Sequence, residues 1–240
     1  MEIADIFHTT EPFERYGTEY FLVLTFYVLA GSLLIYLGRN VNELKKIRIL
    51  KSIGFILSAI IVSWIITESL LGRFNYKNDL PIIFCNFTAL VIPFYFIYRK
   101  QVTFDMLYYI IFAGAIQAII TPGLKFNFPH YEFLKFWTVH VGLIIFILYE
   151  MIVFKKLPSR KGIFTSFLTV QLYVIVVFIL NSIINTNYLY LNTPPDNGTL
   201  LDALGGWPYY IIWMDLILIP YFILLYLPIF LIKRKSKQLS

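Results

Sequence analysis

The sequence predicts an all-α, polytopic membrane protein, a bundle of seven transmembrane helices that forms a single domain over residues 1–240. Of the 240 residues, 59% are apolar or aromatic and 14% are charged, whereas an average soluble domain is about 25% charged. The mean hydropathy is +0.73. One soluble core of this size cannot bury so much apolar surface. These values exclude a soluble enzyme and a disordered chain, and the single cysteine, Cys85, excludes a disulfide scaffold.

Seven stretches are each apolar enough to cross the hydrocarbon core of a bilayer, which is roughly 30 Å thick and takes about 20 helical residues. They are residues 20–38, 52–72, 80–98, 105–121, 133–154, 164–185 and 207–232. These stretches are apolar on every face, whereas the strands of a membrane barrel alternate over about 10 residues. Helices are therefore predicted rather than strands.

The positive charges predict the direction of the bundle. Of the 20 Lys and Arg residues, all but five lie in alternate connections and in the C-terminal tail, as is typical of segments that face the cytoplasm. The N-terminal segment is acidic and includes Glu2 and Asp5. We therefore expect the N-terminus outside and the C-terminus in the cytoplasm. The basic balance is explained by these loops, so no nucleic-acid partner is expected.

Polar side chains inside a membrane usually face the bundle interior or a cavity. At a rise of 1.5 Å per residue, a set of them lies at a similar depth near the outer ends of the spans. The set comprises Glu68, Cys85, Asn86, Gln117, His140, Asn181, Asn185 and Asp215. We expect these residues to line a pocket that opens outward. The alternative is that they are hydrogen-bond partners between helices. Nearer the cytoplasm, Glu150 is expected to pair with Lys155.

Two outer segments are placed to cover this pocket, residues 121–130 and residues 187–195 with their continuation at 200–208. Both are rich in aromatic and turn-forming residues, and their candidate site residues are His130, Asn187, Tyr188 and Trp207. Aromatic residues at this level also serve as interfacial anchors, and Asp202 is expected to cap a short interfacial helix. Both readings stay open.

Cys85 and His140 are the candidates for catalysis. A thiol becomes a nucleophile when it loses its proton, and a neighbouring imidazole can accept that proton. The amides of Asn86, Gln117 and Asn181 are candidates to stabilise an oxyanion or to orient His140. The three histidines form no metal-binding pattern, and no cofactor-binding motif is present, so neither a metal nor a cofactor is expected.

Several segments together resemble the bacterial YwaF-type integral membrane proteins. They are LPIIFC at residues 80–85, GAIQA at 114–118, TP at 121–122, FPH at 128–130, NTNYLY at 185–190 and TLLDALGGWPYY at 199–210. The resemblance covers roughly residues 17–228. This family is distantly similar to eukaryotic multi-spanning acyltransferases that remodel phospholipids, in which a membrane Cys and a His are the proposed catalytic pair. The resemblance assigns those two positions to Cys85 and His140 and implies a bacterial plasma membrane.

Three functions follow from these observations. The first is a membrane acyltransferase or transacylase that acts on membrane lipids through Cys85 and His140. The second is a transporter or a binding protein for a lipid or a polar solute, without enzymatic activity. The third is a structural subunit, in which the polar layer only holds the helices together.

Overall fold

The computed structural model describes residues 11–194 and 204–238, and within these ranges the chain is built from helices. The predicted roles of Glu2, Asp5 and Asp202 fall on residues outside this description. The elements follow the order α2 (Thr18–Arg39), α3 (Glu43–Leu70), α4 (Phe84–Tyr98), α5 (Gln101–Ile120), α6 (Tyr131–Val153), α7 (Arg160–Ile184), the 3₁₀ turn η1 (Tyr188–Tyr190) and α8 (Tyr209–Gln238).

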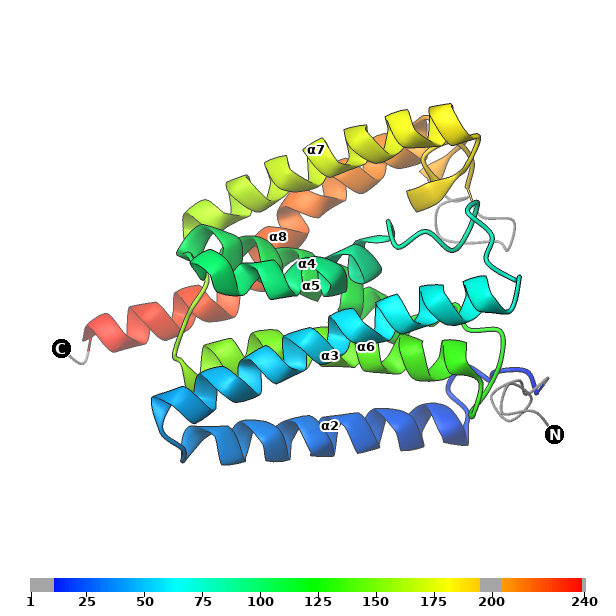
Figure 1. Ribbon diagram of the computed structural model, residues 1–240. Coiled ribbons are helices and arrows are strands. Elements are labelled where there is room, and N and C mark those ends of the chain that lie inside the picture. The colour runs from blue at the N-terminus through cyan, green and yellow to red at the C-terminus, as the bar shows by residue number, and fades with distance from the viewer. Residues whose placement is uncertain (1–10, 195–203, 239–240) are drawn as a thin grey trace.

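Successive helices run up and down the bundle, so that α2 begins and α8 ends at opposite ends (Figure 1). We call the end where α3, α5 and α7 finish the Cys85 end, and the end where α2, α4 and α6 finish the Glu150 end. This arrangement brings the connections of the predicted outer side together at the Cys85 end. Which end faces the cytoplasm stays a prediction.

Within the described residues, six helices are long and apolar enough to cross a membrane: α2, α3, α5, α6, α7 and α8. The third predicted span differs, because its helix begins only at Phe84 and has 15 residues. At 1.5 Å per residue that is about 22 Å, less than the roughly 30 Å hydrocarbon core. Residues 80–83 are not helical, since the Leu80 N–H donates to the Tyr188 hydroxyl and the Ile82 carbonyl accepts from Tyr173. The count of seven spans therefore stays a prediction, while a multi-pass membrane protein is supported.

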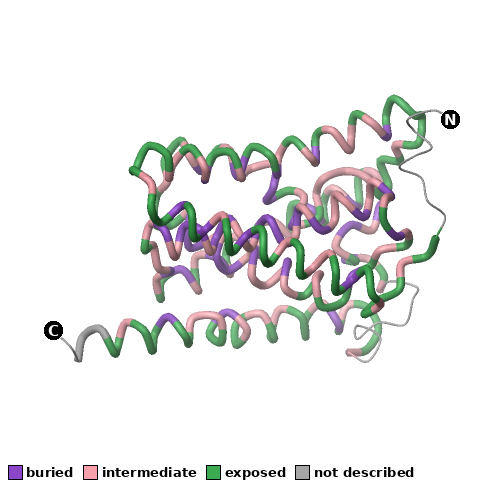
Figure 2. The backbone as a smooth tube through the Cα atoms, turned by 90° about the horizontal axis from the view of Figure 1, so that it is seen from below, coloured by how far each residue is buried: buried purple, intermediate pink, exposed green. Residues whose placement is uncertain are grey.

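The outer faces of the bundle are apolar, which suits contact with lipid. Large hydrophobic side chains on α2, α7 and α8 are more than half exposed, among them Phe26, Leu172 and Trp213. Soluble monomers rarely expose contiguous apolar patches of more than a few hundred Å². Figure 2 shows that the buried residues concentrate in the inner helices, whereas α8 is mostly exposed or half-buried along its length.

Helix α6 lies at the centre and packs against α2, α3, α4 and α5. Two glycines allow close approach to it. A Cβ on Gly38 of α2 would lie 2.5 Å from the Tyr149 ring, and a Cβ on Gly142 of α6 would lie 2.6 Å from Leu57 of α3. Small residues at such crossings let helix backbones approach closely, which is a common basis of association in membranes.

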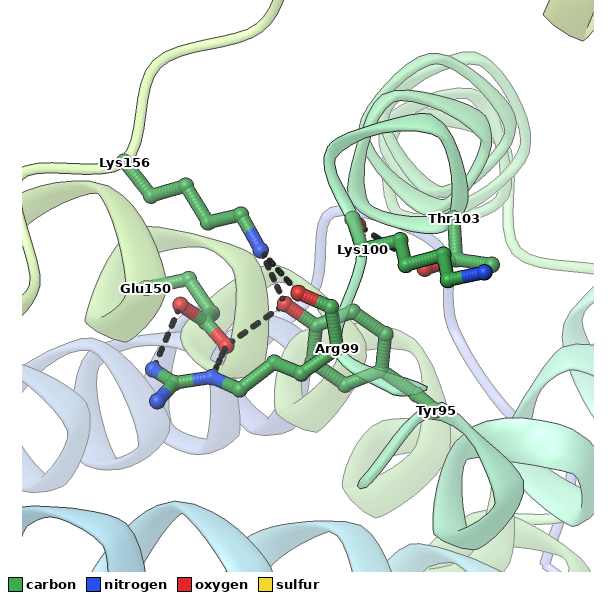
Figure 3. Close-up of polar contacts among 6 residues, drawn as sticks. All are labelled: Tyr95, Arg99, Lys100, Thr103, Glu150 and Lys156. Atoms are coloured by element: carbon green, nitrogen blue, oxygen red, sulfur yellow. Dashed lines mark hydrogen bonds and ion pairs between the residues drawn. The ribbon is translucent and has the colours of Figure 1, made fainter. Parts of the chain in front are cut away.

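A polar cluster fastens α4 to α6 at the Glu150 end (Figure 3). The Arg99 Nε and Nη2 atoms each donate to the Glu150 carboxylate at 2.9 Å, and the Tyr95 hydroxyl donates to it at 2.8 Å. Lys156 donates to the Tyr95 hydroxyl and to the Arg99 carbonyl. The predicted pairing of Glu150 with Lys155 is therefore wrong. Glu150 is fully buried, and the cation that reaches it comes from the end of α4.

Candidate functional site

Cys85 is the second residue of α4 and is buried in the main hydrophobic core. Its sulfur lies 3.3 Å from the point that a Cβ on Gly114 of α5 would occupy. The thiol thus rests on the glycine, and a larger residue there would displace it. This contact with Gly114 places Cys85 where α4 packs against α5.

A cavity of about 250 Å³ lies between α5, α7 and α8 and reaches up to the region of Cys85. Two of its wall residues, Phe84 and Gly114, are the chain neighbour and the packing partner of Cys85. The remaining wall is mostly apolar: Ile110, Ala113, Val170, Val174, Leu189, Leu191, Tyr210, Ile211, Met214, Asp215, Leu218 and Phe222. An apolar cavity with few polar groups is the usual form of a small-molecule site.

The ring of His140, on α6, is held by its own helix. Its Nδ1 lies 2.7 Å from the Phe136 carbonyl oxygen, and the centroids of the His140 and Phe136 rings lie 4.2 Å apart, with the rings tilted by 37°. A carbonyl oxygen only accepts hydrogen bonds, so Nδ1 carries the hydrogen, and in the neutral ring Nε2 is then the proton acceptor. In this tautomer, Nε2 is the nitrogen that can act as a general base.

Cys85 and His140 make no hydrogen bond with each other in the described part of the chain. Their depths are nevertheless similar. Gly114, against which Cys85 packs, lies six residues before the end of α5, or about 9 Å, and His140 lies nine residues after the start of α6, or about 13 Å. Helices α4, α5 and α6 pack against one another. The catalytic pair stays a prediction.

Asn181, Asn187 and Tyr188 build the loop that follows α7. The Asn181 amide donates to the Tyr188 carbonyl at 2.9 Å and accepts from the Tyr188 N–H and the Thr186 hydroxyl. The Asn187 amide makes four such bonds with Asn192 and Thr193. Burial raises the pKa of the Tyr188 hydroxyl, which donates to the Tyr76 carbonyl at 2.7 Å. These groups order the loop.

Three amides of the predicted pocket lie apart from one another. Gln117 is exposed at the end of α5 and donates to the Thr121 hydroxyl. Asn185 is exposed and caps α7 in a left-handed conformation, with a φ of 54°. Asn86 is half-buried next to Cys85, and its amide makes no hydrogen bond within the described residues. Of the three, Asn86 alone adjoins the thiol in the chain.

The remaining candidates each have a defined contact. Glu68 is buried, and its carboxylate accepts hydrogen bonds from Arg73 Nε and Nη2, each at 3.2 Å. His130 caps α6, where its Nδ1 accepts from the Glu132 N–H. The Trp207 indole donates to the Leu191 carbonyl at 2.9 Å.

Asp215 stands in the cavity wall on α8, and its Oδ1 accepts from the Gln171 amide of α7 at 3.0 Å. Gln171 was not predicted as a site residue, because it lies in the inner half of its span, away from the polar residues near the outer ends. A polar residue between Val170 and Leu172 in an apolar span was the signal available. Over residues 11–194 and 204–238, no group of three His, Cys, Asp or Glu side chains is arranged to hold a metal ion.

Taken together, the apolar helices, their lipid-facing surfaces and the polar groups held among them define a polytopic helical membrane protein. The family follows from comparison with known proteins. The profile of the TMEM164 family matches residues 15–226, which is most of the chain, and the chain belongs to this family.

A relative in Treponema pallidum (strain Nichols) is described as an uncharacterized protein. It is 24% identical over 195 residues, which cover 81% of this chain and 79% of the relative. No solved structure matches the chain. The resemblance to YwaF-type proteins and to acyltransferases is not tested by these comparisons.

Proposed function

We propose that this protein transfers acyl groups between membrane lipids through a covalent intermediate on Cys85. The observation that carries the proposal is the position of the thiol against Gly114, which is itself part of the wall of the apolar cavity. A nucleophile beside an apolar cavity is suited to a substrate with a hydrocarbon chain. The proposal requires His140 to approach the thiol, with its Nε2 as the general base.

The reaction has two transfers. In the first, His140 Nε2 takes the thiol proton, the sulfur forms a bond to the ester carbonyl carbon of the donor lipid, and the ester C–O bond breaks. The departing alcohol takes the proton back from His140, which leaves a thioester on Cys85. In the second, His140 takes the proton of an acceptor hydroxyl, the new ester bond forms and the C–S bond breaks. The thiolate then recovers the proton.

We assign the Cys85 end to the outer leaflet, because most of the cations lie at the Glu150 end. A donor from the cytoplasm would have to cross the bilayer to reach a site at that depth. A membrane lipid is therefore the proposed donor, and a second lipid with a free hydroxyl is the proposed acceptor.

The single cysteine makes the test unambiguous, because any thioester on this chain must be on Cys85. Purified protein is incubated with a phospholipid that carries one labelled acyl chain, and its intact mass is then measured. We expect a mass increase equal to the acyl group less one hydrogen, which hydroxylamine removes. Cys85→Ala should show no adduct, and His140→Gln should form it much more slowly at an unchanged melting temperature.

The absence of any adduct on the wild-type protein, together with unchanged lipid turnover by Cys85→Ala, would refute the proposal. Lipid or solute flux through liposomes that survives Cys85→Ala would instead favour a transporter.

A further inference from the structure

The cavity between α5, α7 and α8 contains a carboxylate whose hydrogen-bonding capacity is only partly used. Asp215 Oδ1 accepts from Gln171 Nε2 at 3.0 Å. Its Oδ2 accepts no hydrogen bond within the described residues. The other polar side chain of the wall is Tyr210, and its hydroxyl already donates to the Tyr190 carbonyl at 2.5 Å. Asp215 is therefore the polar group that the wall can offer to an occupant.

The position of Asp215 makes an unused oxygen costly. It lies six residues after the start of α8, or about 9 Å into a helix that is otherwise apolar at this level. A charged side chain inside a membrane helix is costly and usually faces the bundle interior or a cavity. Carboxylates inside membranes are consequently paired, and one amide donor satisfies a single acceptor site of the roughly four that a carboxylate has.

We propose that this cavity binds an amphiphile whose polar end donates hydrogen bonds, an amine or an alcohol, and whose body is a hydrocarbon. The polar end would donate to Asp215 Oδ2, while the apolar side chains of α5, α7 and α8 surround the hydrocarbon. A donor to an ionised carboxylate forms a charge-assisted bond, about twice as strong as a neutral one. A ligand with the same hydrocarbon chain but no hydrogen-bond donor would leave Asp215 Oδ2 without a hydrogen bond.

This inference stands apart from acyl transfer. It needs the cavity and Asp215, and it does not need the thiol. Binding is therefore measured in the Cys85→Ala background, where covalent capture cannot occur. A failed acyl-transfer experiment would leave this inference intact, whereas a cavity that binds none of the probes would also remove the support that it gives to acyl transfer.

The experiment measures binding of three probes with the same hydrocarbon chain to the full-length protein in lipid nanodiscs. The probes are a long-chain primary amine, a monoacylglycerol and a fatty-acid methyl ester, which has no donor. We expect the amine or the monoacylglycerol to bind at least about tenfold more tightly than the ester, the difference that about 1.4 kcal/mol produces. Asp215→Leu should abolish this preference.

Two further comparisons identify the ligand and the site. Asp215→Asn keeps an acceptor but removes the charge, so it should weaken binding of the amine more than binding of the monoacylglycerol. The probe that the parent protein binds more tightly identifies the polar group of the ligand. Val174→Phe fills the cavity wall and should weaken every probe at least tenfold. The matched control, Val176→Phe, places the same ring on the exposed side of α7 and should leave binding unchanged.

Binding is compared only for variants whose unfolding transition is close to that of the parent protein. If Asp215→Leu does not fold, Asp215→Asn is used in its place. Equal affinity for all three probes, no detectable binding of any, or equal loss in Val174→Phe and Val176→Phe would overturn the proposal.

Discussion

The ion pair between Arg99 and Glu150 gives a prediction about which partner matters more for stability. The Glu150 side chain is fully buried, whereas 28% of the Arg99 side chain is exposed. Arg99 also keeps a stacking contact when the carboxylate is absent, since its guanidinium carbon lies 3.9 Å from the centre of the Phe154 ring. Loss of Arg99 leaves a charge with no access to water, while loss of Glu150 leaves a cation that water can reach.

Removing one partner of a buried ion pair costs about 3–5 kcal/mol. We expect Arg99→Met to lower the free energy of unfolding by about 4 kcal/mol. Glu150 then retains the Tyr95 hydroxyl as its donor but loses both hydrogen bonds from the guanidinium. Glu150→Gln should lower the free energy of unfolding by about 2 kcal/mol. The loss is smaller because the amide oxygen of Gln still accepts hydrogen bonds and water can reach part of the guanidinium. The double variant Arg99→Met/Glu150→Leu should lie within about 1 kcal/mol of the wild type, since apolar replacement of a whole pair is often neutral.

The assay is unfolding by SDS in mixed micelles, and the single variant Glu150→Leu completes the double-mutant cycle with Arg99→Met and the double variant. Glu43→Gln is the matched control, because Glu43 pairs with Lys46 but its side chain is 70% exposed, and such surface pairs contribute about 0–1 kcal/mol. A larger loss for Glu150→Gln than for Arg99→Met would refute the reasoning from exposure. A coupling energy near 0.6 kcal/mol is about the average for hydrogen bonds between membrane helices. Such a value would refute the claim that this buried ion pair stabilises the protein more than an ordinary hydrogen bond between helices does.

Two further predictions concern packing and the loop after α7. Gly38→Ala should lose about 1–3 kcal/mol of unfolding free energy through overpacking, because the new Cβ would lie 2.5 Å from Tyr149; Gly123→Ala, with nothing within 4 Å, should change it by less than about 0.5 kcal/mol. Asn181→Asp removes the donor to the Tyr188 carbonyl and should speed hydrogen exchange in residues 186–193, as measured by mass spectrometry. Equal stability of the two glycine variants, or unchanged exchange, would contradict these expectations.

The apolar stretches predicted the helices well and their starts poorly. The second predicted span starts at residue 52, whereas α3 starts at Glu43, where Asn42 caps it by accepting from the Lys45 N–H at 2.9 Å. Likewise α7 starts at Arg160, capped by Ser159, rather than at residue 164. Hydropathy measures which residues suit lipid, while the backbone helix continues into charged turns outside it. The cap residues, which were visible in the sequence, mark the true starts.

Depth along a helix was the sole coordinate available for the site, and it does not determine which side of the helix a residue occupies. Gln117 and Asn86 were expected at a common level, yet Gln117 is exposed while Asn86 lies next to the buried thiol. The partner of Glu150 was sought in the adjacent connection, but it comes from the end of α4, 51 residues earlier. Contacts across helices depend on rotation and packing, which a single sequence does not specify.

The polar groups of the Cys85 end divide according to whether the fold already uses them. The amides of Asn181 and Asn187 are used by the loop that they order. The Cys85 thiol, His140 Nε2 and Asp215 Oδ2 make no hydrogen bond within the described residues, although each lies in an apolar bundle where an unused polar atom is costly. Groups that the fold does not need, and that cost energy where they lie, are the ones to test first for a role in binding or chemistry. All the experiments above on ligands and intermediates therefore address these three atoms.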